Sequence, residues 1–355
     1  MHSTLLVRYS QIGDALIAFP VVYSVAKKCP NDTFTVLTNP KFRGIFRQMP
    51  SNVSLLPMVY RKRNIPLRGL VHLFCRYRLL LTLFFSRKYD RVALLQEGTF
   101  EKQLRFLLQL RGSRVEQIDL RDFLSPEKLQ KREYFQTPSI NQCYIATLER
   151  LGYQQVQNEF PATYYKGERQ TLALQQAKPP YGKPYVGLAP FSRIPSKMYP
   201  LEKMEQVLAY LQQQSSVQIL VFGGGEEEQK HAQSWEARYP NVTSLIGKLS
   251  FDDELSVITA CSLMVSMDSA NLHMAALVNT PAVSIWGPSH PGMGYYPYNV
   301  SVDYAIQKDL PCRPCSFWGE AKCTASSLYE CMDIAPSHIV DRVVAALEDL
   351  KKKSI

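Results

Sequence analysis

The sequence predicts an α/β fold of two domains, each with a parallel sheet covered by helices. Short apolar runs alternate with longer amphipathic runs along the chain, as in β–α repeats. A proline-rich segment interrupts this β–α alternation and divides the chain into two parts of similar size. A length of 355 residues suits about two domains of roughly 100–200 residues each. Hydrophobic residues at 46% and charged ones at 20% exclude wholesale disorder.

The N-terminal domain is assigned to residues 1–160. Leu5 begins the first of several short apolar runs that have the length of strands, and the runs between them have helical spacing. The expected strands are Leu5–Arg8, Thr33–Leu37, Val53–Val59 and Arg91–Leu95, and the expected helices are Asp14–Lys28, Leu67–Ser86 and Phe100–Leu110.

Residues 161–184 contain four prolines and are expected to form a linker, after which the alternation restarts. A second domain is assigned to residues 185–335, with strands Tyr185–Ala189, Val217–Phe222, Met264–Met267 and Ala282–Trp286 and helices Leu201–Gln213, Glu226–Arg238, Asp252–Cys261 and Ala270–Val278. Residues 336–355 are expected to form a C-terminal helix that packs back on the N-terminal domain.

The net charge of +10 is concentrated in the first part of the chain. Residues 1–133 contain 23 Lys and Arg against 10 Asp and Glu, whereas residues 134–355 contain 18 against 21. Such an excess indicates an acidic partner, either nucleic acid, an anionic membrane or a phosphorylated sugar, unless it is only a solvated basic face.

No apolar run approaches the roughly 20 residues needed to span a bilayer, and the N-terminus lacks a signal-peptide layout. A cytoplasmic location is therefore expected. The basic segment from Arg61 to Arg91 has the composition of a helix on an anionic surface, which predicts peripheral contact with the inner face of the inner membrane. The alternative is an amphipathic helix packed on the sheet with a solvated basic side.

Ligands of open α/β sheets bind beyond the carboxyl ends of the strands, so the loops after each strand are the candidate site. The first loop, R-Y-S-Q-I-G-D, places Gly13 in a tight turn and Asp14 at a helix start. Asp14 is either a general base for a substrate hydroxyl or the N-cap of the helix.

Two loops of the second domain carry groups suited to a nucleotide. Ser192, Arg193, Ser196 and Lys197 combine hydroxyls with cations, as a diphosphate site requires, although an ordinary polar loop has the same composition. The run Gly223–Glu228 lets the backbone approach a ligand, and its acids either complement the helix dipole or accept hydrogen bonds from a ribose. It matches neither the dinucleotide-binding nor the Walker motif, which disfavours NAD enzymes and P-loop ATPases.

The fourth loop follows the strand that ends near Asp268. Ser269 opens a helix whose free N–H groups and dipole favour phosphate. His273 either orients this loop or fills the core. The rigid turn Trp286–Gly292 ends the next strand beside it.

The motifs I-G-D, K-M-Y-P, M-D-S-A-N-L-H-M-A-A-L and W-G-P-S-H-P-G occur in this order, and together they resemble glycosyltransferase family 9. Its best-known members are ADP-heptose:lipopolysaccharide heptosyltransferases. The resemblance covers almost the whole chain, and four motifs are far more specific than one. It implies a GT-B fold with two Rossmann-like α/β/α domains facing across a cleft, with the acceptor on the N-terminal side and the nucleotide sugar on the C-terminal side.

The resemblance also implies roles for individual residues. Asp14 matches the general base and Lys197 the lysine that binds the donor diphosphate. The remaining donor-binding positions are Ser192, Arg193, Glu227 (or its neighbours Glu226 and Glu228), Leu249, Asp268, Ser269, Ala270 and His273, and the acceptor-side positions are Ser10, Gly13, Arg61, Lys62 and Arg63. Tyr199, Ala270 and Arg193 replace the family's usual Trp, Gly and hydroxyl residue, which leaves the exact sugar nucleotide open.

Four cysteines form a separate cluster, Cys312-x2-Cys315-x7-Cys323-x7-Cys331. The first pair has the spacing of a zinc site, but no second C-x-x-C follows. A structural zinc, disulfides and reduced thiols all remain open. No other cofactor is expected.

The resemblance implies an inverting, metal-independent transferase that moves a heptose from ADP-heptose to a lipopolysaccharide-core or other lipid-linked acceptor. The rival enzymes are a GT-B transferase using a UDP- or GDP-sugar and a sugar-nucleotide epimerase. A nucleic-acid-binding protein would fit the basic N-terminal part, but the sequence has no nucleic-acid motif, so no specific nucleic-acid partner is expected.

Overall fold

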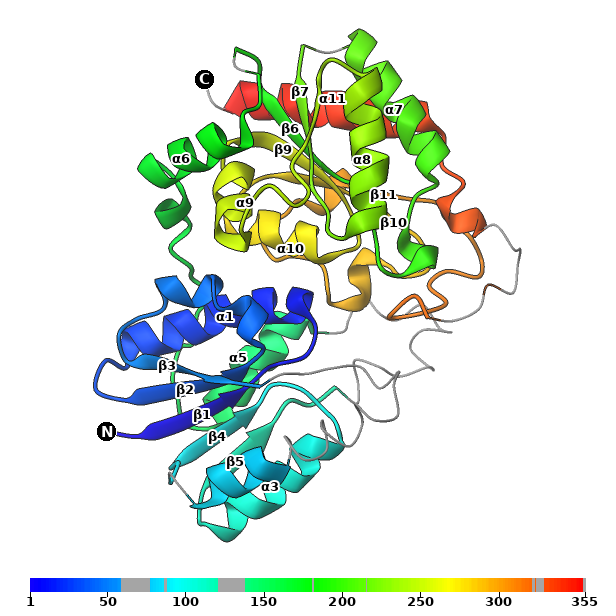
Figure 1. The fold of residues 1–355 in the computed structure, drawn as a ribbon. Coiled ribbons are helices and arrows are strands. Elements are labelled where there is room, and N and C mark those ends of the chain that lie inside the picture. The colour runs from blue at the N-terminus through cyan, green and yellow to red at the C-terminus, as the bar shows by residue number, and fades with distance from the viewer. Residues whose placement is uncertain are drawn as a thin grey trace. The chain divides into compact units, whose positions relative to one another are not determined.

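The computed structural model describes residues 1–58, 77–85, 88–120, 138–180, 182–214, 216–320, 323 and 329–353. They divide into two compact units, one containing Ile140–Phe160 and most of the chain before it, the other running from Pro161 onward. Each unit is a parallel sheet with helices packed on it, so the α/β prediction is confirmed (Figure 1).

The first unit has a five-stranded sheet in the order β3-β2-β1-β4-β5. Its central strand is buried from Thr4 to Val7, with Leu5 and Leu6 at 0% exposure, as expected of a parallel sheet covered on both faces. The strands are β1 Ser3–Val7, β2 Thr33–Thr38, β3 Val53–Pro57, β4 Arg91–Leu94 and β5 Arg114–Gln117, and the helices include α1 Ile12–Lys28, α3 Thr99–Leu110, α5 Ile140–Arg150 and a helical segment at 77–85.

The second unit has a six-stranded sheet in the order β11-β10-β9-β6-β7-β8. Its strands are β6 Tyr185–Ala189, β7 Gln218–Val221, β8 Val242–Ser244, β9 Cys261–Met267, β10 Ala282–Trp286 and β11 Ala305–Gln307. Its α-helices are α6 Glu168–Ala177, α7 Leu201–Gln214, α8 Glu226–Arg238, α9 Phe251–Ile258, α10 Ala270–Leu277 and α11 Pro336–Lys353. Short 3-10 turns include Ala162–Tyr165, Pro195–Lys197 and Glu330–Met332.

Strand order reverses at one place in each sheet. In the first unit β1 pairs with both β2 and β4, and in the second β6 pairs with both β7 and β9. The chain therefore leaves neighbouring strands in opposite directions, and the carboxyl ends of such strands are where open α/β sheets bind their ligands. The loops at these two reversals follow β1 and β4 in one unit, and β6 and β9 in the other.

The C-terminal helix is packed within the second unit, where α11 contacts α7 and strands β9 and β10 (Figure 1). The reason is its apolar stripe, spaced three to four residues apart, which joins the buried core of that unit through Ile339, Val340, Val343 and Ala346. The expectation that it also packs on the N-terminal domain stays a prediction.

The segment expected to be a plain linker is helical and packed. α6 contacts α9, and Gln170 Nε2 donates to Thr259 Oγ1 at 2.8 Å. The helix expected to continue to Cys261 ends at Ile258, since Cys261 already pairs with Tyr185 at the start of β9. Long-range pairing thus overrides a helical pattern that is locally acceptable.

In the part of the chain that the structure describes, no helix is both long and apolar enough to cross a bilayer.

Candidate functional site

A buried ion pair lies at the carboxyl ends of β1 and β4. Arg8 follows β1, and its Nη2 contacts Oδ2 of Asp14, which lies in the first turn of α1. The side chains are only 8% and 6% exposed, and Arg8 Nη1 also donates to the Leu95 carbonyl oxygen at 3.1 Å. Gln11, not Asp14, occupies the N-cap position. The Asp14 carboxylate is therefore held by a cation from the neighbouring strand end, beside Gly13 in the same helical turn.

A second polar network holds the loop that carries these residues. Gln96, just beyond β4, accepts hydrogen bonds from the Tyr9 N–H at 3.0 Å and from the N–H and hydroxyl of Ser10, each at 3.2 Å. Its amide donates to Glu101 Oε1 at 2.8 Å, which also accepts from the Tyr9 hydroxyl at 2.6 Å. The sequence analysis missed Gln96 and Glu101, although Gln96 directly follows a correctly predicted strand.

The second ion pair lies at the carboxyl ends of β6 and β9. Lys197 Nζ lies 2.6 Å from Asp268 Oδ2, and each side chain is 10% exposed. Lys197 ends the 3-10 turn after β6, while Asp268 follows β9 directly, and Ala189 stands opposite Ser266 in the strand register. The sequence analysis selected both residues but did not pair them.

The turn after β10 completes this group. Ser289 Oγ donates to Asp268 Oδ2 at 2.5 Å, which makes it a contact that the sequence analysis missed. The turn can approach the donor loop because it contains Gly287, where a Cβ would stand 2.8 Å from the Ser196 carbonyl oxygen. Any side chain at this position would push the two loops apart.

The remaining predicted donor residues lie on the same loops or on elements nearby in the sequence. Ser192 is half-buried and its Oγ accepts from the Ile194 N–H at 3.2 Å, whereas Arg193 is exposed. Ser269 is the N-cap of α10, with its Oγ 3.3 Å from Ser266 Oγ.

The other three predicted positions lie on α10 or just before α9. Ala270 begins α10, His273 is buried within that helix, and Leu249 is half-buried just before α9. The acceptor-side positions Arg61, Lys62 and Arg63 lie outside the described residues.

Glu227 and Glu228, which follow the glycine turn, make different contacts. Glu227 is exposed and accepts from Lys230 Nζ at 2.8 Å, a hydrogen bond that holds the pKa of Glu227 below its usual value. Glu228 Oε2 accepts instead from the Gly224 N–H at 2.8 Å, and burial raises the pKa of Glu228. Of these two carboxylates, Glu228 is the one that contacts the glycine turn.

No group of three or more His, Cys, Asp and Glu side chains stands in the arrangement of a metal centre within the described ranges.

Two Rossmann-like units, with an acid and cations at the strand-order reversals, have the architecture of a GT-B glycosyltransferase. The sequence profile of glycosyltransferase family 9 (heptosyltransferase) matches residues 127–322, more than half of the chain. The chain therefore belongs to glycosyltransferase family 9, and it is a glycosyltransferase.

Similar proteins agree with this assignment. The chain is 24% identical to lipopolysaccharide heptosyltransferase 3 of Escherichia coli over 285 residues, which cover 78% of this chain and 80% of that protein. It is 22% identical to lipooligosaccharide heptosyltransferase 2 of Haemophilus influenzae over 310 residues, 81% of this chain and 84% of that protein. The structure of the E. coli ADP-heptose lps heptosyltransferase II has the same fold, with a TM-score of 0.69 at 18% identity over 98% of this chain and 99% of that one.

Replacing Arg8 by Gln should destabilise the protein strongly, because the Asp14 carboxylate then stays buried without its partner. The expected loss in free energy of unfolding, measured by chemical denaturation, is about 3–5 kcal/mol. Arg8→Met combined with Asp14→Leu should recover most of this loss. The matched control is Lys230→Ala, which breaks an exposed pair and should change stability little. Equal effects of Arg8→Gln and Lys230→Ala would contradict a buried, coupled pair.

Proposed function

We propose that this enzyme transfers a heptose from ADP-heptose to an acceptor in the lipopolysaccharide core, with inversion at the anomeric carbon and without a metal ion in the chemistry. The observation that carries the proposal is the placement of the two ion pairs. The I-G-D carboxylate stands at the strand-order reversal of one unit, and the Lys197–Asp268 pair at that of the other. Family membership and the names of the relatives support a heptose donor.

In this proposal, Asp14 acts on the acceptor. Its carboxylate takes the proton from a sugar hydroxyl as the hydroxyl oxygen attacks the anomeric carbon of the donor. Arg8 fixes the orientation of the carboxylate, and Gln96 fixes the loop that carries both. The attack comes from the side opposite the leaving nucleotide, so one bond forms as the other breaks and the configuration inverts.

The second unit stabilises the leaving group. Negative charge grows on the ADP diphosphate as its bond to the sugar breaks, and preorganised cations and N–H donors lower the energy of that state. Lys197 supplies a cation, Arg193 a second one at the loop surface, and the α10 start after Ser269 supplies N–H groups. Asp268 holds Lys197 in place until the phosphates compete for it. These charges perform the task that a divalent metal performs in other transferases.

Peripheral contact with an anionic membrane through the basic segment 61–91 stays a prediction, since most of that segment lies outside the described residues.

The donor is tested by incubating the purified enzyme with lipopolysaccharide lacking outer heptose and with ADP-heptose, UDP-sugars or GDP-sugars. We expect release of ADP only, without added divalent metal and after a brief EDTA treatment, and an NMR coupling that reports the opposite anomer in the product. Release of UDP or GDP, or interconversion of sugars without transfer, would instead establish one of the rival enzymes.

Asp14→Asn should lower kcat by about 10²–10⁴-fold, because the amide cannot accept the proton. The KM for the donor should change little, since Asp14 belongs to the unit that is not proposed to bind it. Steady-state kinetics and the melting temperature check this together. Glu149→Gln, an exposed acid of the same unit, is the matched control and should keep full activity. Near-wild-type turnover in folded Asp14→Asn would remove the base assignment.

Lys197→Ala should weaken ADP binding by about tenfold or more, which corresponds to the loss of one charge-assisted hydrogen bond. Isothermal titration calorimetry measures this without acceptor or turnover. Lys203→Ala removes a lysine that pairs with Asp333 at the surface and serves as the control. Unchanged ADP affinity in Lys197→Ala would exclude a diphosphate role.

A further inference from the structure

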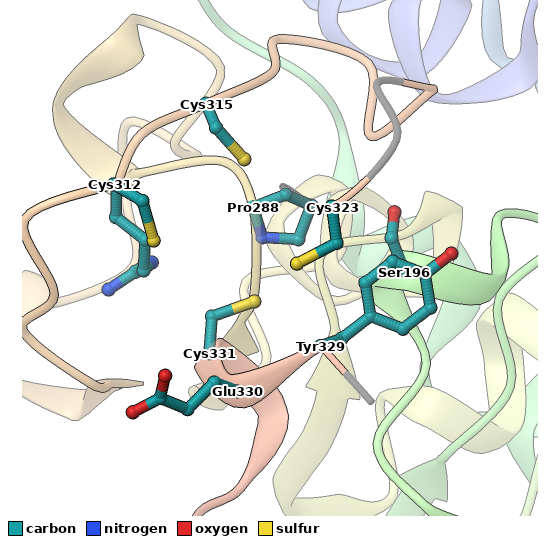
Figure 2. Close-up of a pocket in the computed structure, with 9 residues that line it drawn as sticks. Ser196, Pro288, Cys312, Cys315, Cys323, Tyr329, Glu330 and Cys331 are labelled. Atoms are coloured by element: carbon teal, nitrogen blue, oxygen red, sulfur yellow. The ribbon is translucent and has the colours of Figure 1, made fainter. Parts of the chain in front are cut away.

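Four cysteines that the proposed mechanism does not use line one cavity. Cys312, Cys315, Cys323 and Cys331 line it together with Ser196, Pro288, Arg313, Tyr329 and Glu330, and it is partly open to solvent. Figure 2 shows their sulfur atoms directed toward the space beside Pro288. All four are free thiols.

The four thiols differ in exposure. Cys331 is buried, Cys323 is half-buried, and Cys312 and Cys315 are exposed, so the cavity that they line is accessible from solvent.

The four cysteine sulfurs in the lining of the cavity favour a metal ion that binds thiolates, such as zinc or iron. Four cysteine sulfurs, two of them in C-x-x-C spacing, form the ligand set that zinc and iron prefer in tetrahedral sites. As the thiols stand, no three of the described side chains are yet in coordinating arrangement, so an ion has to draw them together. Ion binding would displace the thiol protons and tighten the segment that carries the cysteines.

That segment is packed directly on the donor loop. The Gly319 carbonyl oxygen accepts from Ser196 Oγ at 2.6 Å, and the Phe317 carbonyl oxygen lies 3.5 Å from Lys197 Nζ. Gly319 has a φ of +76°, and a Cβ there would stand 2.9 Å from Ser196 Oγ and 3.0 Å from Lys197 Cε. Phe317 and Gly319 therefore pack directly against Ser196 and the side chain of Lys197.

Arg313 links the same segment to Asp268. It is 5% exposed and donates to the carbonyl oxygens of Gly287, Lys308 and Ser289, the last at 2.8 Å. The Cys315 N–H donates to the Pro288 carbonyl oxygen at 3.0 Å. This holds the turn whose Ser289 hydroxyl binds Asp268. The cysteine segment thus contacts Lys197 directly and reaches Asp268 through one turn.

We propose that Cys312, Cys315, Cys323 and Cys331 bind one structural zinc-class metal ion, and that this ion positions the donor loop by holding the cysteine segment against Ser196 and Lys197. The ion takes no part in the transfer itself. The positioning half rests on the proposed function, because it assumes that Lys197 binds the donor diphosphate.

The test starts with elemental analysis of the full-length enzyme, purified under reducing conditions without a polyhistidine tag. We expect about one zinc or iron ion per chain, as for other structural thiolate sites. Cobalt added to the metal-free enzyme should produce the sulfur-to-cobalt absorption of a tetrahedral thiolate site. Cys312→Ser with Cys315→Ser should lose the metal and the absorption, whereas Cys29→Ser, a cysteine outside the cavity, should keep both.

ADP titration then tests the positioning. Metal-free enzyme, and independently Cys323→Ser, should bind ADP about tenfold more weakly, the effect of losing one charge-assisted hydrogen bond, and metal should restore only the unmutated enzyme. Absence of metal with no cobalt absorption would overturn the site. Full metal content with unchanged ADP affinity on its removal would overturn the positioning role. Failure of metal-loaded wild-type enzyme to bind ADP would contradict the proposed function and leave the site intact.

Discussion

The pairing of β6 with β9 is the constraint on which the donor side of this enzyme depends. These strands are separated by β7, β8 and the helices between them, and they become neighbours only because strand order reverses at this point. Their loops then meet, and Lys197 reaches Asp268. Either charge alone at this depth would be costly, so each residue stabilises the other.

The first unit uses the same geometry for a different purpose. β1 and β4 are brought together by an equivalent reversal, and Arg8, Asp14 and Gln96 all lie at its mouth. Here the cation comes from one strand end and the acid from the following helix, so the carboxylate is oriented from the side of the sheet. A repeated Rossmann-like unit thus offers one natural position for function, and each copy places different chemistry there.

The segment between β11 and α11 stands outside this repeat. Arg313 donates its hydrogen bonds to main-chain carbonyl oxygens, which connects the segment to the turn after β10. The cysteines of the segment line a common cavity. It contacts the donor loop through Gly319 and Phe317, two residues without ionisable groups. Donor-loop geometry therefore depends on residues that no search for charged side chains would select.

The sequence by itself determined the α/β class, the order of most strands and helices, and the loops that carry the site, because these follow from local apolar periodicity and from motifs contiguous in the chain. It also identified Asp14, Lys197 and Asp268 individually. The tertiary structure decided their partners. Ser289 reaches Asp268, and Gln96 reaches the loop before Asp14, only through strand neighbours that are distant in sequence. Arg8 comes from the same β1–α1 connection as Asp14, but only the folded turn places the two side chains in contact. It likewise placed α11 in the second unit, ended α9 before Cys261, and separated the roles of Glu227 and Glu228. The position of α11, the end of α9 and the contacts of the two glutamates depend on which surfaces meet in the folded chain. The local sequence pattern does not determine those contacts.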